Sequence, residues 1–418
     1  MGLTASLLLA GGVVWGCAGS AAAMELATSG ASRASESLTD ATQAASATTA
    51  FGIDLLETSG YASGNVVLSP TSVAIALAMA RAGANGQTAS QMDAVMHSAA
   101  GSAGGNGMNS LDRSLAELSG VYKVLGQDRQ VTLHVANSPF AQSGYQLAPG
   151  YLDTLASRFG AGLRLVDFSG DPDGAVKVIN TWVSDETEGR IKSLLGQLDP
   201  MTRLVLVNAI YLKAPWLTPF DAGATSSQPF TRLDGSQVKV PMMSDAVDGM
   251  YAEGSGWQAA DIPYVGGSLV MTVIVPNDLA SFERSLTPDQ FGRYVGALRP
   301  AQFGLALPRF KTEKKVDLKG ILSAMGMPLA FDPARADFSG ITSQERLSIS
   351  QVVHQATISV DENGTEATAA TAVAMAVSSA IPIGSSITLR VDRPFIFAIR
   401  DTRTGAVLFL GRIVDPSA

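Results

Sequence analysis

A stretch of small residues near the C-terminus, 362–379, constrains the fold of this chain more than any other segment. It reads ENGTEATAATAVAMAVSS, with larger apolar side chains only towards its end. At the period of two that strands show, Thr365 and Thr371 fall on one face, while Glu366 and Ala370 fall on the other, towards solvent or small neighbours. We interpret the stretch as a latent strand, exposed and extended, that can join a sheet. The alternative is an alanine-rich helix, because alanine is the best helix former.

The order of the remaining patterns indicates an α+β fold. Helical patterns such as 149–159 occur mostly in the first half, and strand patterns such as 347–360 and 407–414 occur mostly in the second. Residues 203–212 are almost continuously apolar and rich in β-branched side chains, which predicts a strand buried on both faces. Helices that precede a run of strands favour large mixed or antiparallel sheets.

Composition excludes several classes of protein. A net charge of −8 on 418 residues argues against a nucleic-acid-binding protein. A hydrophobic fraction of 46% favours a buried core over disorder. Beyond the N-terminus the sequence has no apolar stretch of ~20 residues, so we expect no membrane-spanning helix there.

The N-terminal segment predicts export. Residues 1–23 carry no charge and contain a short apolar run, which is typical of a signal peptide. The only cysteine, Cys17, ends a motif, 14–17, that resembles a bacterial lipobox, and this predicts lipidation and a mature N-terminus at Cys17. Cleavage after 21–23 is the alternative. We expect residues 24–46, rich in Ala, Ser and Thr, to form a flexible tether and residues 47–418 to form the folded domain. The protein is then secreted or lies at the cell surface, and a lipid on Cys17 would be its only attachment to a bacterial membrane.

The sequence lacks the side-chain patterns of an enzyme. It contains neither a Gly-x-Ser-x-Gly elbow nor a phosphate-binding loop. The three histidines, His97, His134 and His354, are far apart and lack the spacing of metal ligands. We therefore expect no enzymatic activity, no metal and no other cofactor.

Four segments resemble, in order, the signatures of the serpin family. They span residues 65–92, 179–191, 206–220 and 392–416 and include SPTS at 69–72, LVNAIYLK at 206–213 and DRPF at 392–395. The resemblance covers roughly residues 47–416 and indicates an inhibitory, bacterial member. It implies three β-sheets, about nine helices and an exposed reactive-centre loop at 362–379.

The resemblance also implies the activity. A target serine protease, itself secreted, attacks the loop of such an inhibitor as a substrate. The cleaved loop then inserts into the main sheet while the protease is still bound as a covalent acyl complex. A strand of ~17 residues at ~3.3 Å each spans about 55 Å, enough to carry the protease across the inhibitor. The uncleaved fold is then metastable and held by kinetics. The inhibitor is expected to act as a monomer.

The usual loop length of the family places the reactive bond between Ser378 and Ser379. Val377 is the alternative to Ser378 as the residue that precedes the reactive bond. Small or apolar side chains there favour elastase-, chymotrypsin- or subtilisin-like proteases over trypsin-like ones, and no Lys or Arg occurs between Glu362 and Thr388.

The resemblance assigns further positions to three sites. The hinge of the loop is Glu362, Gly364, Thr365, Glu366, Ala367, Thr368, Ala369, Ala370 and Thr371. The shutter is Ser72, Asn208 and His354, where a histidine bonded to Asn and Ser is expected to hold the sheet closed. The breach is Trp216, Arg309 and Glu362, with an expected Arg309–Glu362 pair.

Small, uncharged residues on the inward face of the hinge favour an inhibitor. The alternative is a non-inhibitory serpin that acts as a binding or scaffold protein.

Overall fold

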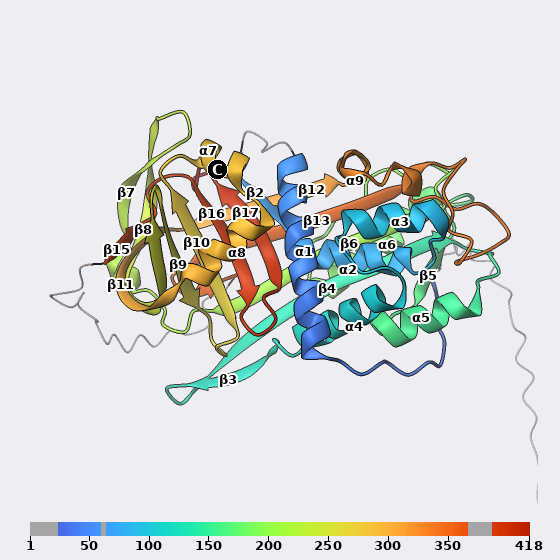
Figure 1. Ribbon diagram of the computed structural model, residues 1–418, viewed down its shortest axis with the longest axis horizontal. Coiled ribbons are helices and arrows are strands. Elements are labelled where there is room, and N and C mark those ends of the chain that lie inside the picture. Colours follow the sequence, from blue (N-terminus) through green and yellow to red (C-terminus); the bar gives the residue numbers. More distant parts are fainter. Residues whose placement is uncertain (1–23, 60–63, 367–386) are drawn as a thin grey trace, which may run out of the picture.

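The computed structural model describes residues 24–59, 64–366 and 387–418, where it shows nine α-helices and two large networks of strands (Figure 1). This agrees with the predicted α+β class. The predictions for Cys17, Ala367–Thr371 and Val377–Ser379 concern residues outside these ranges. No helix within them is long and apolar enough to cross a membrane. The helices are α1 (Leu38–Thr58), α2 (Pro70–Arg81), α3 (Gly86–Val95), α4 (Ser102–Ala116), α5 (Pro149–Phe159), α6 (Pro172–Glu186), α7 (Leu279–Ser285), α8 (Pro288–Ala297) and α9 (Lys319–Met325).

The first network is an eight-stranded sheet that carries most of the predicted site residues. In spatial order its strands are β1 (Glu25–Ala27), β5 (Leu163–Val166), β4 (Gln127–Gln142), β6 (Leu204–Pro215), β14 (Gly364–Thr365), β13 (Gln351–Asp361) and β12 (Phe310–Asp317), with β3 (Gly120–Val124) paired to β4. Strands β6 and β13 run parallel and pair directly over 351–356, and beyond that point β14 lies between them.

The second network has nine strands and forms the opposite end of the molecule from α2–α5 (Figure 1). Its strands are β15 (Thr388–Arg390), β11 (Arg299–Pro308), β8 (Gln237–Gly254), β9 (Trp257–Pro263), β10 (Leu269–Pro276), β16 (Phe395–Asp401), β17 (Val407–Ile413) and β2 (Val66–Leu68), with β7 (Ser226–Thr231) paired to β8. We predicted three separate sheets. Hydrogen bonding joins them into two networks because the 18-residue strand β8 pairs in turn with β7, β11 and β9.

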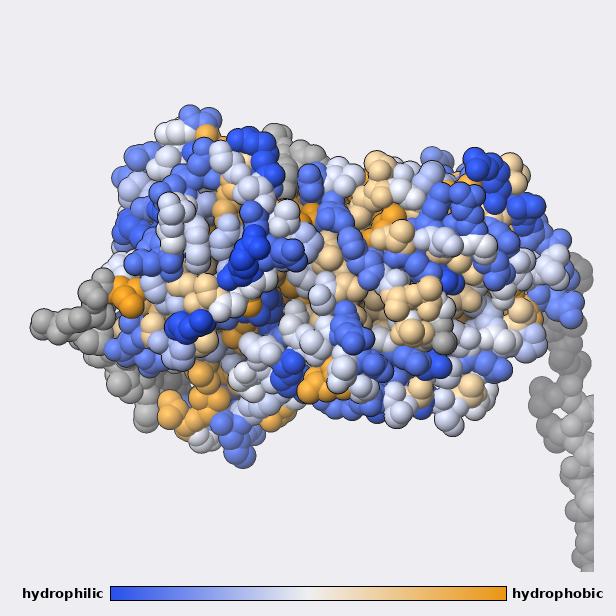
Figure 2. Space-filling view, viewed as in Figure 1, coloured by the Kyte–Doolittle hydropathy of each residue, from blue (hydrophilic) through white to orange (hydrophobic). Residues whose placement is uncertain are grey.

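Strand β6 is buried on both faces, as its apolar run predicts. Leu204 and Leu206 belong to the main core, whereas the alternating Val205 and Val207 pack in a second cluster with side chains of α6. Because successive side chains of a strand point to opposite faces, one continuous apolar run serves both clusters. Polar and charged residues dominate the face of the molecule seen in Figure 2, and the apolar areas on it are small and separate.

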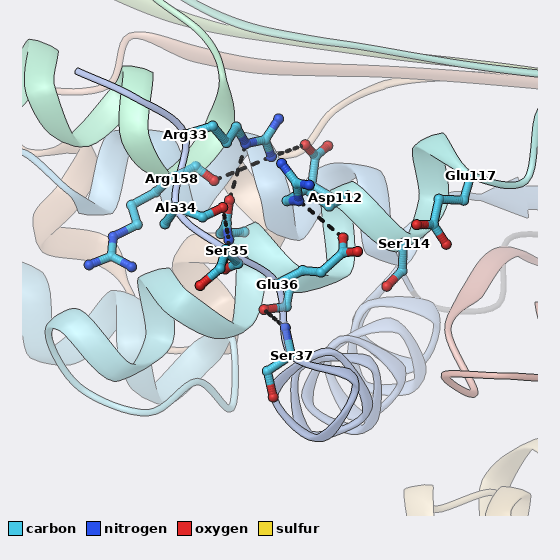
Figure 3. A network of polar contacts seen from close by, with 12 residues as sticks. Arg33, Ala34, Ser35, Glu36, Ser37, Asp112, Ser114, Glu117 and Arg158 are labelled. Carbon is cyan, nitrogen blue, oxygen red and sulfur yellow. Dashed lines mark hydrogen bonds and ion pairs between the residues drawn. The ribbon is translucent and has the colours of Figure 1, made fainter.

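The segment predicted as a flexible tether, 24–46, is structured. Strand β1 pairs with β5, and α1 begins at Leu38, ahead of the expected domain boundary at 47. Between them Arg33 bonds Asn109 and forms an ion pair of 2.5 Å with Asp112 (Figure 3). The composition indicated a linker, but it could not reveal a half-buried carboxylate on α4 that needs a cation.

Replacing Arg33 tests whether this segment stabilises the fold. Burial raises the pKa of Asp112 and the Arg33 guanidinium opposes that effect, so Arg33→Ala leaves a half-buried carboxylate without its partner. We expect the free energy of unfolding to fall by about 1–3 kcal/mol, measured by denaturant titration. The neighbouring Arg113–Glu36 pair is more exposed, at 39% and 37%, so Arg113→Ala should change the free energy of unfolding by less than about 1 kcal/mol. Equal effects of the two variants would show that Arg33 is an ordinary surface charge.

Candidate functional site

The first residues of the hinge already lie inside the eight-stranded sheet. Gly364 and Thr365 pair with Pro215 and Ala214 of β6 on one side and with β13 on the other. Thr365 is 1% exposed, and its hydroxyl is 2.5 Å from that of Tyr264. We predicted an exposed loop from Glu362 onwards, so the prediction was wrong for these two residues and for Glu362, which is 5% exposed. A glycine followed by a small side chain fits between two strands that are splayed apart at this end.

Gly364 occupies a backbone conformation that excludes other residues. Its φ is +148°, and an added Cβ would lie 2.2 Å from the carbonyl oxygen of Ala214. Since real Cβ atoms do not approach a carbonyl oxygen so closely, any side chain at 364 must displace β14 from its position beside β6. The hinge glycine predicted from the sequence is therefore required by close packing of the backbone.

The period-two pattern predicts that Glu366 meets solvent or small neighbours, but its side chain does not face solvent. Its φ is +46°, which turns the chain out of the strand conformation, and its side chain is only 7% exposed. Arg190 lies 3.7 Å away, yet no described residue donates a hydrogen bond to Oε2. Burial raises the pKa of the Glu366 carboxyl, and Arg190 opposes the rise. The inserted hinge therefore carries a poorly compensated charge.

Glu366→Gln is expected to stabilise the uncleaved protein. Because the folded pKa is raised, the native state holds this proton more tightly than the unfolded chain, so stability falls as pH rises above the ordinary value of 4.5. The difference in melting temperature between Glu366→Gln and the wild type should be small at pH 4.5 and should grow towards pH 8. The neutral amide should gain on the order of 1 kcal/mol at neutral pH. A pH-independent difference would contradict this account.

The breach is built around Trp216, which is completely buried. Its indole stacks on Tyr264 with ring centroids 4.4 Å apart, and its Nε1 donates to the carbonyl oxygen of Asp361 at 2.9 Å. Its backbone N–H donates to Asn363 at 2.9 Å. Trp216 thus fixes the turn that leads from β13 into β14, and Tyr264 links that turn to Thr365.

Glu362 receives bonds from two elements at the same place. Arg309 contacts its Oε1 at 2.6 Å, and the Thr225 hydroxyl donates to the same atom at 2.5 Å. Burial raises the pKa of the Glu362 carboxyl, but these bonds outweigh burial and hold it below its usual value. The Arg309–Glu362 contact was expected, whereas Thr225 was missed because nothing in its sequence context marks it.

The shutter residues form a polar row across three neighbouring strands. Asn137 of β4, Asn208 of β6 and His354 of β13 are register partners at one level of the sheet. The His354 Nδ1 and Asn208 Oδ1 are hydrogen-bonded across the β6–β13 seam, and Asn208 Nδ2 donates to Asn137 Oδ1. The hydroxyl of Ser72, on α2, donates to Asn137 Oδ1 and accepts from Asn208 Nδ2. The row therefore ties together β6 and β13, the two strands that flank β14.

His354 is held as a neutral imidazole. Its Nε2 accepts from the backbone N–H of Ser69 at 3.1 Å, so Nδ1 carries the proton that it shares with Asn208. Burial lowers the pKa of His354 to about 3. We expected His354 to bond Ser72, but the partner is the backbone of Ser69. Asn137 was also missed, and its only signal was a polar residue within a strand.

The described residues contain no group of three or more His, Cys, Asp or Glu able to hold a metal ion. Gly364 and Thr365 lie between β6 and β13, and farther along the same seam His354 is bonded to Asn208.

Comparison with known proteins agrees with this architecture. The profile of the family described as "Serpin (serine protease inhibitor)" matches residues 46–416. An uncharacterised serpin-like protein of Thermococcus kodakarensis is 37% identical over 369 residues, 88% of this chain and 84% of its own. The leukocyte elastase inhibitor of Bos taurus is 34% identical over 392 residues, 90% of this chain and all of its own. The native-state crystal structure of the thermophilic serpin tengpin superimposes with a TM-score of 0.80 at 26% identity, covering 94% of this chain and all of that one.

Proposed function

Because the chain belongs to the serpin family and has the serpin fold, we propose that it inhibits a serine protease by cleavage and insertion of residues 362–379. One observation carries the proposal. Gly364 and Thr365 already pair with both β6 and β13, which supports insertion of the following residues at the same place. The residues that follow, 367–372, are all Ala or Thr and can continue the strand with little steric resistance.

We propose that the target has elastase-, chymotrypsin- or subtilisin-like specificity and is held as a covalent acyl complex. The inhibitor acts as a monomer. The support is the sequence Val377-Ser378-Ser379 and the lack of a basic residue between 362 and 388. The similarity to a leukocyte elastase inhibitor points to the same class of target.

The test is incubation with one protease of each class. We expect an SDS-resistant complex, and a released C-terminal peptide that starts at Ser379, or at Ser378 if Val377 precedes the reactive bond. Cleavage without a complex should raise the melting temperature if insertion occurs. Cleavage by every protease with neither a complex nor a rise in melting temperature would reject the inhibitor and favour the non-inhibitory scaffold.

We also propose that the protein is exported and lipidated at Cys17. The support is the uncharged segment 1–23 and its single cysteine. Expression in a bacterium with labelled palmitate should label the wild type but not Cys17→Ala. Labelling of neither, with secretion of a chain that begins near residue 24, would favour ordinary signal cleavage.

A further inference from the structure

The chain contains three Asn-Gly pairs, at 85–86, 106–107 and 363–364. Asparagine before glycine is the pair of residues most prone to spontaneous deamidation, in which the glycine nitrogen attacks the asparagine side chain. Glycine favours the attack because it has no Cβ to block it and because its backbone adopts many conformations. The surroundings of each pair in the fold then decide which asparagine reacts.

Helices hold the first two pairs. Asn106 and Gly107 belong to α4, and Gly107 is packed so closely that an added Cβ would lie 3.2 Å from the Cβ of Ala44. Asn85 precedes α3, and its Nδ2 donates to the hydroxyl of Ser339 at 3.0 Å. We expect both asparagines to react slowly while the fold is intact, because helical hydrogen bonds fix the backbone that would have to rotate.

Asn363 lies instead in the two-residue turn between β13 and β14, where Asp361 and Gly364 pair. Its side-chain amide is partly exposed and has no hydrogen-bond partner in the described part of the chain. The backbone of the turn, by contrast, is held. The N–H groups of Asn363 and Gly364 donate to the carboxylate of Asp361. The carbonyl oxygen of Asn363 accepts from the N–H of Trp216 at 2.9 Å.

These backbone bonds oppose the reaction. For the Gly364 nitrogen to reach Cγ of Asn363, the peptide group between the two residues must rotate out of its bonds to Asp361 and Trp216. Gly364 is closely packed where it lies, since an added Cβ would be 2.2 Å from the carbonyl oxygen of Ala214. The reaction therefore requires β14 to leave the sheet, and β14 is only two residues long. Short elements with few contacts open locally at a small cost in free energy.

We propose that Asn363 is a deamidation site that β14 protects and that, once modified, keeps the hinge out of the sheet. The Gly364 nitrogen forms a bond to Cγ of Asn363 as the Cγ–Nδ2 bond breaks, and the side-chain amide leaves as ammonia together with the proton of the Gly364 N–H. Water then opens the resulting succinimide ring. Attack of water at one carbonyl gives aspartate, and attack at the other gives isoaspartate, whose main chain is one methylene longer.

Both products alter the turn. Each places a third carboxylate beside Asp361 and Glu362, where Arg309 is the cation that contacts Glu362. Isoaspartate also lengthens the chain ahead of Gly364, whose close packing leaves no space for a displaced backbone. Strand β14 should then no longer fit between β6 and β13. The reaction thus acts as a timer that changes the hinge of the uncleaved protein irreversibly.

The protection by β14 is tested by storing the full-length, uncleaved protein at pH 8.5 and following all three Asn-Gly pairs by peptide mapping with mass spectrometry. Thr365→Arg should drive β14 out of the sheet, because the variant would otherwise bury a cation without a partner. We expect it to accelerate deamidation at Asn363 by about tenfold, while Asn106 keeps its wild-type rate. The matched control Thr365→Val should deamidate like the wild type.

Tyr264→Phe opens the sheet more mildly, because it removes only the hydroxyl that is hydrogen-bonded to Thr365 at 2.5 Å. It should accelerate deamidation at Asn363 by about threefold and leave Asn106 unchanged. This variant decides the test if Thr365→Arg fails to fold, which faster deamidation at Asn106 would reveal.

The effect on the hinge is measured by hydrogen–deuterium exchange. In the intact protein the Glu366 N–H donates to the Ser359 carbonyl oxygen at 2.7 Å, so it should exchange slowly. After deamidation at Asn363 this protection should be lost. Asn363→Gln stored in the same way should keep it, because a glutamine must close a larger ring and does so more slowly. The aged wild type should also yield less SDS-resistant complex, and this last expectation alone rests on the proposed function.

Two results would overturn the proposal. The first is equal deamidation of Asn363 in the wild type and in a folded Thr365→Arg or Tyr264→Phe variant, which would show that β14 protects nothing. The second is a deamidated protein in which the Glu366 N–H still exchanges slowly, which would show that the modified hinge stays in the sheet. Neither measurement involves a protease, so either result leaves the proposed inhibitory function standing.

Discussion

Thr365→Arg is expected to convert the protein from an inhibitor into a substrate. Thr365 is enclosed between β6 and β13 at 1% exposure, and its hydroxyl is hydrogen-bonded to another buried hydroxyl, that of Tyr264. Insertion of an arginine there would bury a cation without a partner, at a cost of several kcal/mol. We expect the yield of SDS-resistant complex to fall more than about tenfold, while the loop is still cleaved at the wild-type rate.

The control for this variant is Thr365→Val, which keeps the shape and removes only the hydroxyl. It should still form the complex, because a valine can be buried in the sheet without a charge. If Thr365→Arg and Thr365→Val inhibit equally well, the loop does not insert at this position and the proposed mechanism is wrong.

His354→Ala is expected to have the largest effect on the stability of the uncleaved fold. The substitution leaves the backbone N–H of Ser69 and the side-chain Oδ1 of Asn208 buried without their partners. It also opens a cavity between β6 and β13. We expect a loss of about 3 kcal/mol at pH 7, measured by denaturant titration, and faster conversion on heating to inserted or polymeric forms on native gels.

The loss of stability caused by His354→Ala should become smaller at acidic pH. The folded pKa of His354 is about 3 and its ordinary value is 6.5, so below pH 6.5 the unfolded chain takes up a proton that the native state refuses. The stability of the wild type is therefore lost as pH falls from 6.5 towards 3, at up to about 1.4 kcal/mol per pH unit, and the variant does not share this loss. By pH 4.5 the two proteins should be nearly equal in stability.

His134→Ala serves as the control, because this histidine lies on the surface at 39% exposure. The free energy of unfolding of His134→Ala should differ from that of the wild type by less than about 1 kcal/mol at pH 7 and at pH 4.5. A gap between His354→Ala and the wild type that stays constant from pH 7 to pH 4.5 would show that His354 is not the neutral, buried group described above.

Local patterns predicted the elements whose residues carry their own signal. The helix at Pro149–Phe159 and the doubly buried strand β6 lie where their periodicity places them. The hinge glycine was also recognisable, because Gly364 stands between acidic residues and a run of small ones. Patterns of this kind depend only on residues that are close together in the chain, so the sequence is sufficient to predict them.

Long-range partners could not be predicted in the same way. Asn137 looks like any polar residue on a strand until β4 lies beside β6 and places it next to Asn208. Arg33 looks like part of a linker until α4 presents Asp112. Each contact joins residues more than 70 positions apart, and composition carries no information about such distances.

The sequence by itself determined that the chain has a large core and a glycine ahead of a run of small residues, since these follow from side-chain size and spacing. Only the tertiary structure decided that Gly364 and Thr365 lie between two strands of the sheet. That outcome depends on the gap between β6 and β13, where Tyr264 meets Thr365, and the gap is a property of strands brought together from distant parts of the chain.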